Sequence, residues 1–408
     1  MVNKSAYSDL ELMQARIIMI PRGWVFSYVG KVFSIKNNLR RPISEEIRAK
    51  NVGKYPYFGP TKIQGYIDTY EQDGHYVLIG EDGDHFLKYK SQSMTQLVDG
   101  KCTVNNHAHI IEGTNEAIRE WFYYYFMHRD IFSFLSRQGA GRYKLNKASL
   151  EKIPLIVPPL GEQKKIAEII STWDKAIAIT EKLLANSQLQ KKALMQQLLT
   201  GEKRLAGFKQ AWSKVKVSKM GSISSGGTPD TTKKEYWDGG INWLTPTDVT
   251  SLKSRYVFST NKTISEKGLK SSSAKMLPRG ALLICTRATI GAMAISTTEI
   301  ATNQGFKNLV PNAEFSVEFL YYLFTFNVKE LVRKSSGSTF LELSKSDFEK
   351  LTFLCPCLDE QHKIASVLIA ADDAIAVQQQ KLHYLKQEKK ALMQQLLTGK
   401  RRVKVEAA

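Results

Sequence analysis

The stretch KKALMQQLLTG occurs twice in this chain, letter for letter, at residues 191–201 and again at residues 389–399. The second copy follows the first at an offset of 198 positions, in a sequence of 408 residues. An identity of this length at about half the chain length indicates an internal duplication, which has to be read before any other pattern. The sequence therefore predicts two copies of one structural unit.

The register of the repeat holds without a gap over a long span of each copy. At the same offset, Asn105 matches Asn303, Gly139 matches Gly337, Leu145 matches Leu343, and Glu162 with Gln163 matches Glu360 with Gln361. Upstream the register breaks, because Trp24 and Trp212 look equivalent but are separated by only 188 positions. A shared frame with divergent front halves favours one scaffold that carries two specificities. Simple drift after duplication is the alternative interpretation.

The charge of the chain indicates a polyanionic partner. Lys and Arg number 58 against 39 Asp and Glu, a formal charge of +19. This excess is spread along the sequence and is not concentrated at one end of the chain. Distributed positive charge suits a long nucleic acid better than a short anionic ligand.

Cysteine usage and hydropathy predict a reducing compartment. The four cysteines include Cys355 and Cys357 in a C-P-C arrangement, which has neither metal-ligand nor thioredoxin spacing. The first 20 residues contain acidic side chains and no cleavage-like site, so they do not resemble a secretory signal. The sequence has no apolar run of about 18 residues. We therefore expect no membrane span and a cytoplasmic location.

Two long helices are predicted, one in each copy of the repeat. After Pro159 no proline appears until the stop at Gly201, and the only glycine in between is Gly161 at the start. This predicts a helix of about 40 residues and about 60 Å. Apolar residues recur at alternating spacings of four and three, as in coiled coils. The predicted seam residues are Ile166, Ile170, Trp173, Ile177, Leu184, Leu194 and Leu198, and then Ile364, Leu368, Ile375, Leu382, Leu385, Leu392 and Leu396.

Polar residues interrupt this seam at Thr180, Lys191, Gln378 and Lys389, where they can fix the register of a helix pair. Only a short link, residues 202–207, separates the first helix from the next globular segment. If the helices pair, the second must therefore run back along the first. We therefore expect an antiparallel helical spacer with a globular head at each end. An approximate internal dyad relates the two heads. Two helices that pack separately on their own heads are the alternative.

The predicted fold class is α+β. We place the domain boundaries where the composition of the sequence changes. The first head covers residues 1–160, the central helix 161–206, the second head 207–358, and the last helix with its basic tail 359–408. Each head contains an aromatic run, WFYYYF at 121–126 and FLYYLF at 319–324. Such a run can stack on bases, but a buried helix is the favoured interpretation. The tail at 400–404 is predicted to be loose.

Signatures of catalysis are absent from the sequence. There is no G-x-x-x-x-G-K-[ST] phosphate loop and no [NDS]-P-P-[FYW] tetrapeptide of amino-methyltransferases. Cys102, His107 and His109 lack a second ligand pair, so we expect no metal site. Asp230 and Glu235 are not completed by a Glu-x-Lys nuclease pattern. The sequence favours a binding subunit without catalytic residues.

The motifs resemble the specificity subunit of type I restriction–modification systems. The resemblance rests on VPPLGEQKKIAEIISTWD at residues 157–174 and its echo CPCLDEQHKIASVLIAADD at residues 355–373. It also rests on the two KKALMQQLLTG stretches and on SSGGTPDTTKKEYWDGGINWLTPTDV at residues 224–249. It covers nearly the whole chain. One departure is Cys355-Pro356-Cys357, which keeps a single proline where the family has a pair. The loop from Gln138 to Lys144 is similar to a family loop, and its counterpart at 336–339 lacks the basic pair.

The resemblance implies two target-recognition domains that each read one half of an asymmetric, split DNA site, with the paired helices setting the gap. It implies double-stranded DNA and two modification subunits as partners, joined by restriction subunits. S-adenosylmethionine, ATP and Mg²⁺ are expected in those partners, with no cofactor in this chain. A coiled-coil scaffold without DNA readout is the alternative, and a chain that is itself a nuclease or methyltransferase is a third.

Basic and polar residues near turns are the predicted DNA contacts, since Lys and Arg bind phosphates while Arg, Asn and aromatic side chains read base edges. Taken singly, each of them is more often a solvated or structural residue. The candidates are Lys36, Asn37, Arg40, Arg41, Lys54, Tyr57, Lys62, Arg142 and Lys144 in the first head, and Thr228, Lys233, Lys234, Trp243, Thr245, Thr247, Arg287, Asn303 and Lys307 in the second.

Overall fold

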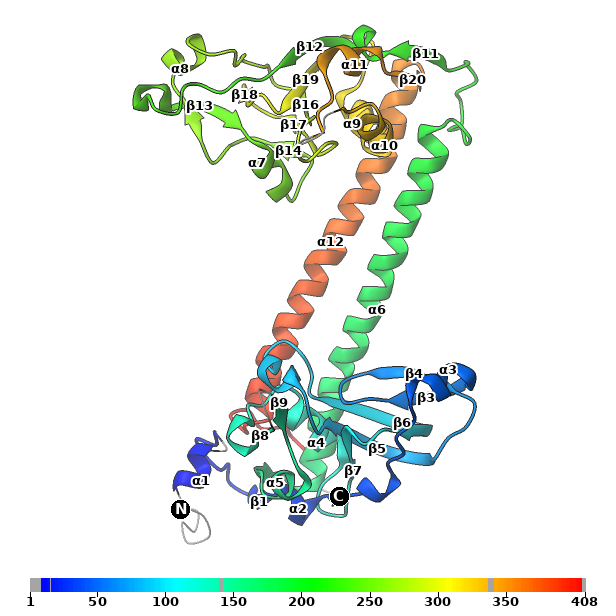
Figure 1. The fold of residues 1–408 in the computed structure, drawn as a ribbon, viewed down its shortest axis with the longest axis vertical. Helices are drawn as coiled ribbons and strands as arrows, with labels where there is room; N and C mark the ends of the chain where they lie inside the picture. Colours follow the sequence, from blue (N-terminus) through cyan, green and yellow to red (C-terminus); the bar gives the residue numbers. More distant parts are fainter. Residues whose placement is uncertain (1–8, 15, 139–141, 337–340, 406–408) are drawn as a thin grey trace. The chain divides into compact units, whose positions relative to one another are not determined.

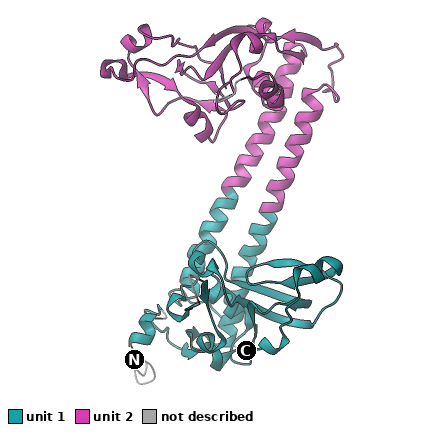
Figure 2. Ribbon diagram, viewed as in Figure 1, with its two compact units in different colours: residues 1–180, 381–408 teal, residues 181–380 magenta. Residues whose placement is uncertain are grey.

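The computed structural model describes residues 9–14, 16–138, 142–336 and 341–405. The chain forms two compact units (Figure 2), of which unit 1 contains residues 1–180 and 381–408, and unit 2 contains residues 181–380. Each unit combines one head with one half of each long helix, α6 (Leu160–Leu199) and α12 (Leu358–Leu396). The predicted domain boundaries cut the chain at the ends of these helices, whereas the compact units divide both helices near their middles.

The head of unit 1 is built on a six-stranded sheet with the order β2-β7-β5-β6-β3-β4 (Figure 1). Its elements are α1 (Asp9–Gln14), β1 (Val25–Tyr28), α2 (Val29–Val32), β2 (Ser34–Ile35), η2 (Asn37–Leu39), α3 (Glu45–Lys50), β3 (Val52–Phe58), β4 (Ile63–Ile67), β5 (Gln72–Gly80), η3 (Asp84–Lys88), β6 (Thr95–Val104), β7 (Ala108–Glu112), α4 (Arg119–Met127), η4 (Phe132–Phe134), β8 (Ser136–Gln138), β9 (Arg142–Lys144), α5 (Lys147–Glu151) and β10 (Pro154–Val157).

The central strand β5 packs side chains against two separate cores. Val77 and Ile79 belong to the cluster that contains the aromatic residues of α4, whereas Leu78 belongs to a second cluster on the opposite face. Successive side chains of a strand point to opposite faces, so the apolar run buries both sides of the sheet. The WFYYYF run lies in α4 with Trp121 and Phe122 fully buried, which confirms the core interpretation.

The head of unit 2 contains a five-stranded sheet, β12-β19-β16-β17-β14, and a three-stranded sheet, β15-β13-β18. Its elements are β11 (Ser213–Lys216), η5 (Val217–Lys219), β12 (Gly221–Ser225), η6 (Lys234–Tyr236), β13 (Trp237–Leu244), α7 (Pro246–Ser251), β14 (Tyr256–Val257), β15 (Thr263–Ile264), α8 (Glu266–Lys270), β16 (Leu282–Cys285), β17 (Met293–Ser296), β18 (Ala301–Thr302), β19 (Phe306–Pro311), α9 (Val317–Phe326), α10 (Val328–Arg333), α11 (Lys345–Lys350) and β20 (Thr352–Cys355).

The two heads share a frame that includes five strands of their main sheets. In each unit an early strand pairs antiparallel with the strand that leads into a long helix, β1 with β10 and β11 with β20. The aromatic helix α9 is buried like α4, through Phe319, Tyr322 and Phe324. The main sheets share five strands in the same order and with the same pairings, β2-β7-β5-β6-β3 in unit 1 and β12-β19-β16-β17-β14 in unit 2. The prediction of one scaffold is therefore confirmed. The heads differ in β4, which extends the first sheet, and in the separate β15-β13-β18 sheet of the second.

The long helices run antiparallel to each other within each unit. In unit 1, Asp174 of α6 pairs with Lys389 of α12, and Glu162 pairs with Arg402 beyond the end of α12. In unit 2, Ser187 of α6 accepts a hydrogen bond from Gln378, and Lys191 pairs with Asp372. Residue numbers thus rise along one helix as they fall along the other. All fourteen predicted seam residues are buried or half-buried.

The C-terminal tail is not loose, so that prediction is wrong. Arg402 forms an ion pair with Glu162, donates a 2.7 Å hydrogen bond to the Arg22 carbonyl, and lies over the ring of Trp24. Val403 packs against the core of unit 1. A buried carboxylate and an aromatic ring hold the basic tail in place, which its composition alone did not reveal. Among the described ranges, every helix is too short or too polar to cross a membrane.

Candidate nucleic-acid interface

Gln163 and Gln361 join each head to its long helix through equivalent sets of hydrogen bonds. The Gln361 Oε1 accepts from the Ser316 N–H at 3.0 Å, and its Nε2 donates to the Glu314 and Pro356 carbonyls. Gln163 makes the same three bonds with Ile118, Glu116 and Pro158. Both amides are almost fully buried. Each glutamine therefore satisfies three backbone groups at the junction between head and helix.

The residue before each glutamine is a buried glutamate at the start of one long helix. It binds an arginine in the segment that follows the end of the other long helix. Glu360 is 1% exposed and accepts hydrogen bonds from Arg204 at 2.6 Å and from the Trp212 indole at 3.1 Å. Glu162 binds Arg402 and the Trp24 indole in the same way. Residues 202–205 and 400–403 are thus equivalent, and alignment of the repeat at the 198-residue offset could have identified both arginines.

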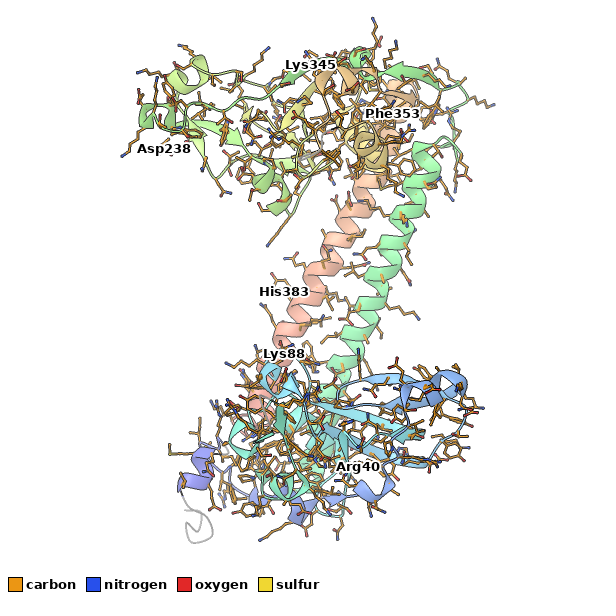
Figure 3. All side chains as sticks on the ribbon, viewed as in Figure 1. Arg40, Lys88, Asp238, Lys345, Phe353 and His383 are labelled. Atoms are coloured by element: carbon orange, nitrogen blue, oxygen red, sulfur yellow. The ribbon has the colours of Figure 1, made fainter. Side chains whose placement is uncertain are left out.

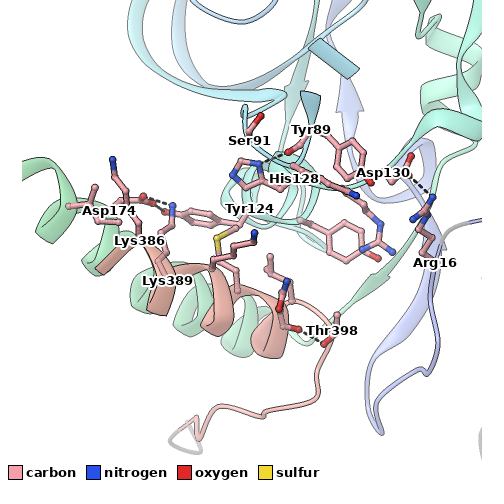
Figure 4. Close-up of a pocket in the computed structure, with 18 residues that line it drawn as sticks. Arg16, Tyr89, Ser91, Tyr124, His128, Asp130, Asp174, Lys386, Lys389 and Thr398 are labelled. Atoms are coloured by element: carbon pink, nitrogen blue, oxygen red, sulfur yellow. Dashed lines mark hydrogen bonds and ion pairs between the residues drawn. The ribbon is translucent and has the colours of Figure 1, made fainter. Parts of the chain in front are cut away.

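A second polar cluster, here called the Tyr–Asp–Lys triad, lies further along the helices in each unit. In unit 1, Asp174 of α6 accepts a 3.0 Å hydrogen bond from the Tyr124 hydroxyl and pairs with Lys389 (Figure 4). Burial and the neighbouring carboxylate raise the pKa of Tyr124 above its ordinary value, so the hydroxyl remains a donor at neutral pH. The triad connects the head to both helices.

Unit 2 contains the same triad, made of Tyr322, Asp372 and Lys191. The Tyr322 hydroxyl donates to Asp372 at 2.6 Å, and Lys191 forms an ion pair with the same carboxylate. Lys191 and Lys389 belong to the two KKALMQQLLTG stretches. The duplicated sequence therefore contributes one lysine to each triad, and these are the lysines predicted to fix the register of the seam.

We expect the Asp174–Lys389 pair to stabilise the antiparallel register by about 1–2 kcal/mol, between the values for exposed and buried ion pairs. Asp174→Lys alone, or Lys389→Asp alone, places like charges together and lowers the free energy of unfolding. The double variant restores an attractive pair and recovers most of that loss. Urea denaturation of the four proteins in a double-mutant cycle measures the coupling. Additive losses in the double variant would show that the pair does not set the register.

Eight of the predicted DNA contacts have exposed side chains. In the head of unit 1, Lys54 is exposed within β3 and Lys62 is exposed in the turn after it. Arg41 is also exposed, although it forms an ion pair with Glu71. The eight are Arg41, Lys54, Lys62 and Arg142 in the first head, and Lys233, Lys234, Thr247 and Arg287 in the second. Arg142 follows residues 139–141, so the middle of the predicted loop at 138–144 lies outside the described residues, as does most of its counterpart at 336–339.

Seven further candidates are half-buried and have intramolecular partners. Arg40 (Figure 3) pairs with Glu81 and donates to the Asn106 carbonyl at 3.0 Å, while Lys144 pairs with the same glutamate. The other five are Lys36, bound to Glu112, Asn37, bound to His109 and Ile110, Thr228, bound to Gln304, Thr245, which caps α7, and Asn303, which accepts from the Gly305 N–H. These side chains are therefore engaged by partners within the free protein.

Three candidates are buried in the free chain and have internal partners. Tyr57 is 2% exposed, and its hydroxyl accepts from the Ile43 N–H. The Trp243 indole donates to the Gly227 carbonyl at 2.9 Å inside the second head. Lys307 is 5% exposed and pairs with Glu342. In each case the side chain satisfies an internal group, which the turn-rich local sequence did not indicate.

An exposed cluster of aromatic and basic residues on the first head was not predicted. Tyr55 and Tyr70 lie with ring centroids 4.9 Å apart, Lys54 lies over the Tyr55 ring, and Lys101 lies 4.6 Å from the centroid of the Tyr70 ring. Tyr70 is 40% exposed. Lys101 joins the cluster because β5 and β6 pair in a long hairpin, a contact that spacing in the sequence does not reveal. Rings and cations together suit a nucleic-acid surface.

The second head has its own cluster of tryptophan, tyrosine and lysine residues. Trp237 packs edge-on against the buried Trp243, and Lys262 lies over the Trp237 ring. Lys233 lies over the Tyr236 ring, at 5.3 Å from its centroid. Unlike Lys101, Lys233 was among the predicted contacts. The two heads therefore present different arrangements of the same residue types.

The residues considered for metal or nuclease chemistry have structural partners. Cys102 is buried with its thiol near the Gln72 side chain, and burial raises its pKa to about 11. His109 is held between Asn37 and the Leu145 carbonyl, whereas His107 binds Asp82. Asp230 caps a turn at Thr232. In the described part of the chain, no three His, Cys, Asp or Glu side chains converge as metal ligands would.

Comparison with known proteins agrees with the repeat and its resemblance. The family model described as "Type I restriction modification DNA specificity domain" matches residues 21–186 and 209–387. The MjaIX specificity subunit of Methanocaldococcus jannaschii is 40% identical over 166 residues, which span 40% of this chain and 38% of that protein. The putative MjaX specificity subunit of the same organism is 23% identical, over 98% of each chain.

Solved structures agree in fold. The S subunit of a type I restriction–modification system from M. genitalium superposes with a TM-score of 0.63 at 15% identity, covering 93% of this chain and 97% of that one. This likeness concerns the fold alone, while the two family matches cover most of the sequence, one in each copy of the repeat. The chain belongs to the family of type I restriction–modification DNA specificity domain proteins and carries two copies of that domain.

Proposed function

We propose that this chain is the sequence-specificity subunit of a type I restriction–modification complex, in which each head reads one half of an asymmetric, bipartite DNA site. The observation that supports this most strongly is the pair of DNA specificity domains that share one frame but carry different aromatic–basic clusters. Because the clusters of the two heads differ while their frames are equivalent, we expect the two heads to read different half-sites. The seam of α6 and α12 sets the number of unread base pairs between them.

The chain itself acts without catalysis. We propose that two modification subunits bind S-adenosylmethionine and methylate adenine at the site that this chain selects, and that restriction subunits use ATP and Mg²⁺ to cut DNA. An adenine must leave the duplex before methylation, and the cost of that step falls on the partners. Because the target is cellular DNA, the complex works in the cytoplasm.

Mapping of methylated adenines in DNA from cells that express this chain with its modification subunits tests the proposal. The expected result is one split motif with two unrelated halves separated by a fixed gap. Methylation in a continuous or palindromic motif would contradict the proposal that the two heads read different half-sites. Loss of the chain should abolish the motif. If methylation persists without the chain, and the chain binds no duplex even with its partners, it is a protein-binding scaffold.

Lys233 and Lys234 provide a direct test of phosphate contact by the second head. Both are exposed, and Lys233 stands beside the aromatic Tyr236. Each phosphate contact contributes about 0.9 to the slope of log affinity against log salt. The double change Lys233→Ala with Lys234→Ala should therefore reduce that slope by about 2, measured by fluorescence anisotropy on the assembled complex. The control is Lys182→Ala with Lys381→Ala, which removes two exposed lysines from the long helices and should leave the slope unchanged.

A further inference from the structure

A cavity of about 910 Å³ lies within unit 1, beside the Tyr–Asp–Lys triad (Figure 4). One wall is the C-terminal half of α12, and the facing walls are the end of α4, the segment after η3, and α6. The lining includes Tyr89, Lys90, Tyr124, His128, Arg129 and Asp174 on the head and α6, opposite Lys386, Lys389, Lys390 and Met393 on α12. We call this cavity the basic pocket. Its volume lies within the range of ligand-binding sites in proteins.

The lining of the basic pocket is strongly positive. Six cationic side chains face two carboxylates, and both carboxylates have cationic partners, because Asp130 pairs with Arg16 and Asp174 with Lys389. Burial lowers the pKa of His128, and the nearby Lys389 acts in the same direction, so the imidazole is neutral at pH 7. Its Nδ1 donates to the Tyr89 carbonyl at 2.7 Å. The excess positive charge favours an anionic occupant.

The floor of the basic pocket is apolar. Ile177 of α6, Met393 of α12 and Leu397 line it together with the rings of Tyr124 and Tyr125. A DNA duplex presents phosphates on a convex surface and offers no apolar group that could enter such a recess. A protein segment can provide both an apolar or aromatic anchor and carboxylates beside it. The combination of an apolar floor and cationic walls therefore favours an acidic protein segment over DNA.

Unit 2 closes the corresponding position with its own chain. Arg255 reaches the Asp372 carboxylate at 3.4 Å and the Tyr322 hydroxyl at 3.2 Å, and it also pairs with Asp373. The position equivalent to Asp373 in unit 1 is Lys175. The side chain of Asp174 is 37% exposed, compared with 25% for Asp372. The two units therefore differ at this position. Tyr124 and Asp174 face a cavity, whereas their counterparts in unit 2, Tyr322 and Asp372, face Arg255.

We propose that the basic pocket is the docking site for an acidic segment of one modification subunit, whose apolar or aromatic anchor packs against Tyr124, Ile177 and Met393. Lys90 and Lys390 bind the carboxylates of that segment from opposite walls. This inference rests on the proposed function, in which modification subunits assemble on this chain. Since Arg255 closes the counterpart in unit 2, the two modification subunits bind with unequal affinity.

The repeat supplies a matched pair of variants for the test. Lys390 and Lys192 occupy the same position in the two KKALMQQLLTG stretches, and both are exposed, but only Lys390 lines the basic pocket. Full-length chains with Lys390→Glu or Lys192→Glu are titrated with the purified modification subunits and followed by native mass spectrometry and calorimetry. Lys390→Glu is expected to weaken one of two binding steps by about 10-fold or more, because repulsion replaces an attractive contact. Lys192→Glu should change neither step by more than about 2-fold.

Lys90→Glu, a change on the opposite wall, should weaken the same step and so provides a second variant. Equal effects of Lys390→Glu and Lys192→Glu would overturn the proposal, since the repeated helix and not the pocket would then be the docking surface. A loss of duplex affinity with unchanged subunit binding would assign the pocket to DNA instead. If wild-type chain binds no modification subunit at all, the proposed function fails, a result distinct from two unaffected binding steps.

Discussion

Lengthening α6 and α12 together by seven residues is expected to widen the gap between the two half-sites by about 3 base pairs. Seven residues add about 11 Å to a helix at about 1.5 Å per residue, and a base pair occupies about 3.4 Å of duplex. Insertion of one heptad after Thr180 and one after Gln378 keeps the apolar seam in phase. These two positions are equivalent in the repeat, and both lie in the seam. Both half-site sequences should remain the same.

Methylation mapping of cells that carry the lengthened chain measures the gap. The control is a heptad inserted into α6 alone, which cannot keep both the Asp174–Lys389 and the Lys191–Asp372 pairs in register. That variant should lose stability and methylate poorly at any gap. A doubly lengthened chain that still methylates at the original gap would show that the helices do not act as the spacer.

Replacing Gln361 by leucine is expected to lower the free energy of unfolding by about 3 kcal/mol. Leucine has a similar volume but leaves the Ser316 N–H and the Glu314 and Pro356 carbonyls without their partner. Each buried polar group left without a hydrogen bond costs about 1–3 kcal/mol, and partial access to water offsets some of the sum. Gln163→Leu should have an effect of the same size in unit 1, because its three hydrogen bonds are equivalent.

Chemical denaturation of the full-length chain checks these values. Gln379→Leu is the control, since this exposed glutamine lies on the same helix and its replacement should change stability by less than about 0.5 kcal/mol. Gln361→Glu separates packing from hydrogen bonding. The carboxylate can still accept from the Ser316 N–H but repels both carbonyls, so it should destabilise the protein as well. A stable Gln361→Leu variant would mean that water replaces the amide.

The long helices and their seam were predictable because the signal is local and periodic. The spacing of apolar residues between Pro159 and Gly201 indicated α6 to within a few residues, and the same spacing indicated α12. The aromatic runs were correctly predicted as buried helices from their aromatic density, which is also a local signal. The 198-residue offset also places Lys191 and Lys389, the two seam lysines, in equivalent positions.

The surface of the heads was predicted less well. Turn-borne polar residues were chosen as DNA contacts, yet Tyr57, Trp243 and Lys307 are buried by groups far away in the sequence. Whether a polar side chain faces solvent or an internal partner depends on strand pairing, which no local pattern encodes. Lys101 was missed for the same reason, because the β5–β6 hairpin carries it to Tyr70.

The sequence by itself determined the duplication, the two long helices, their antiparallel direction and the family, because a repeat and a heptad pattern are properties of residue order. Only the tertiary structure decided which polar residues of the repeat bind each other. It placed Lys389 on Asp174, returned Arg402 to Glu162, and put Arg255 against Asp372 while the equivalent place in unit 1 stayed open. These contacts join residues separated by more than one hundred positions, and their partners are selected by packing in space.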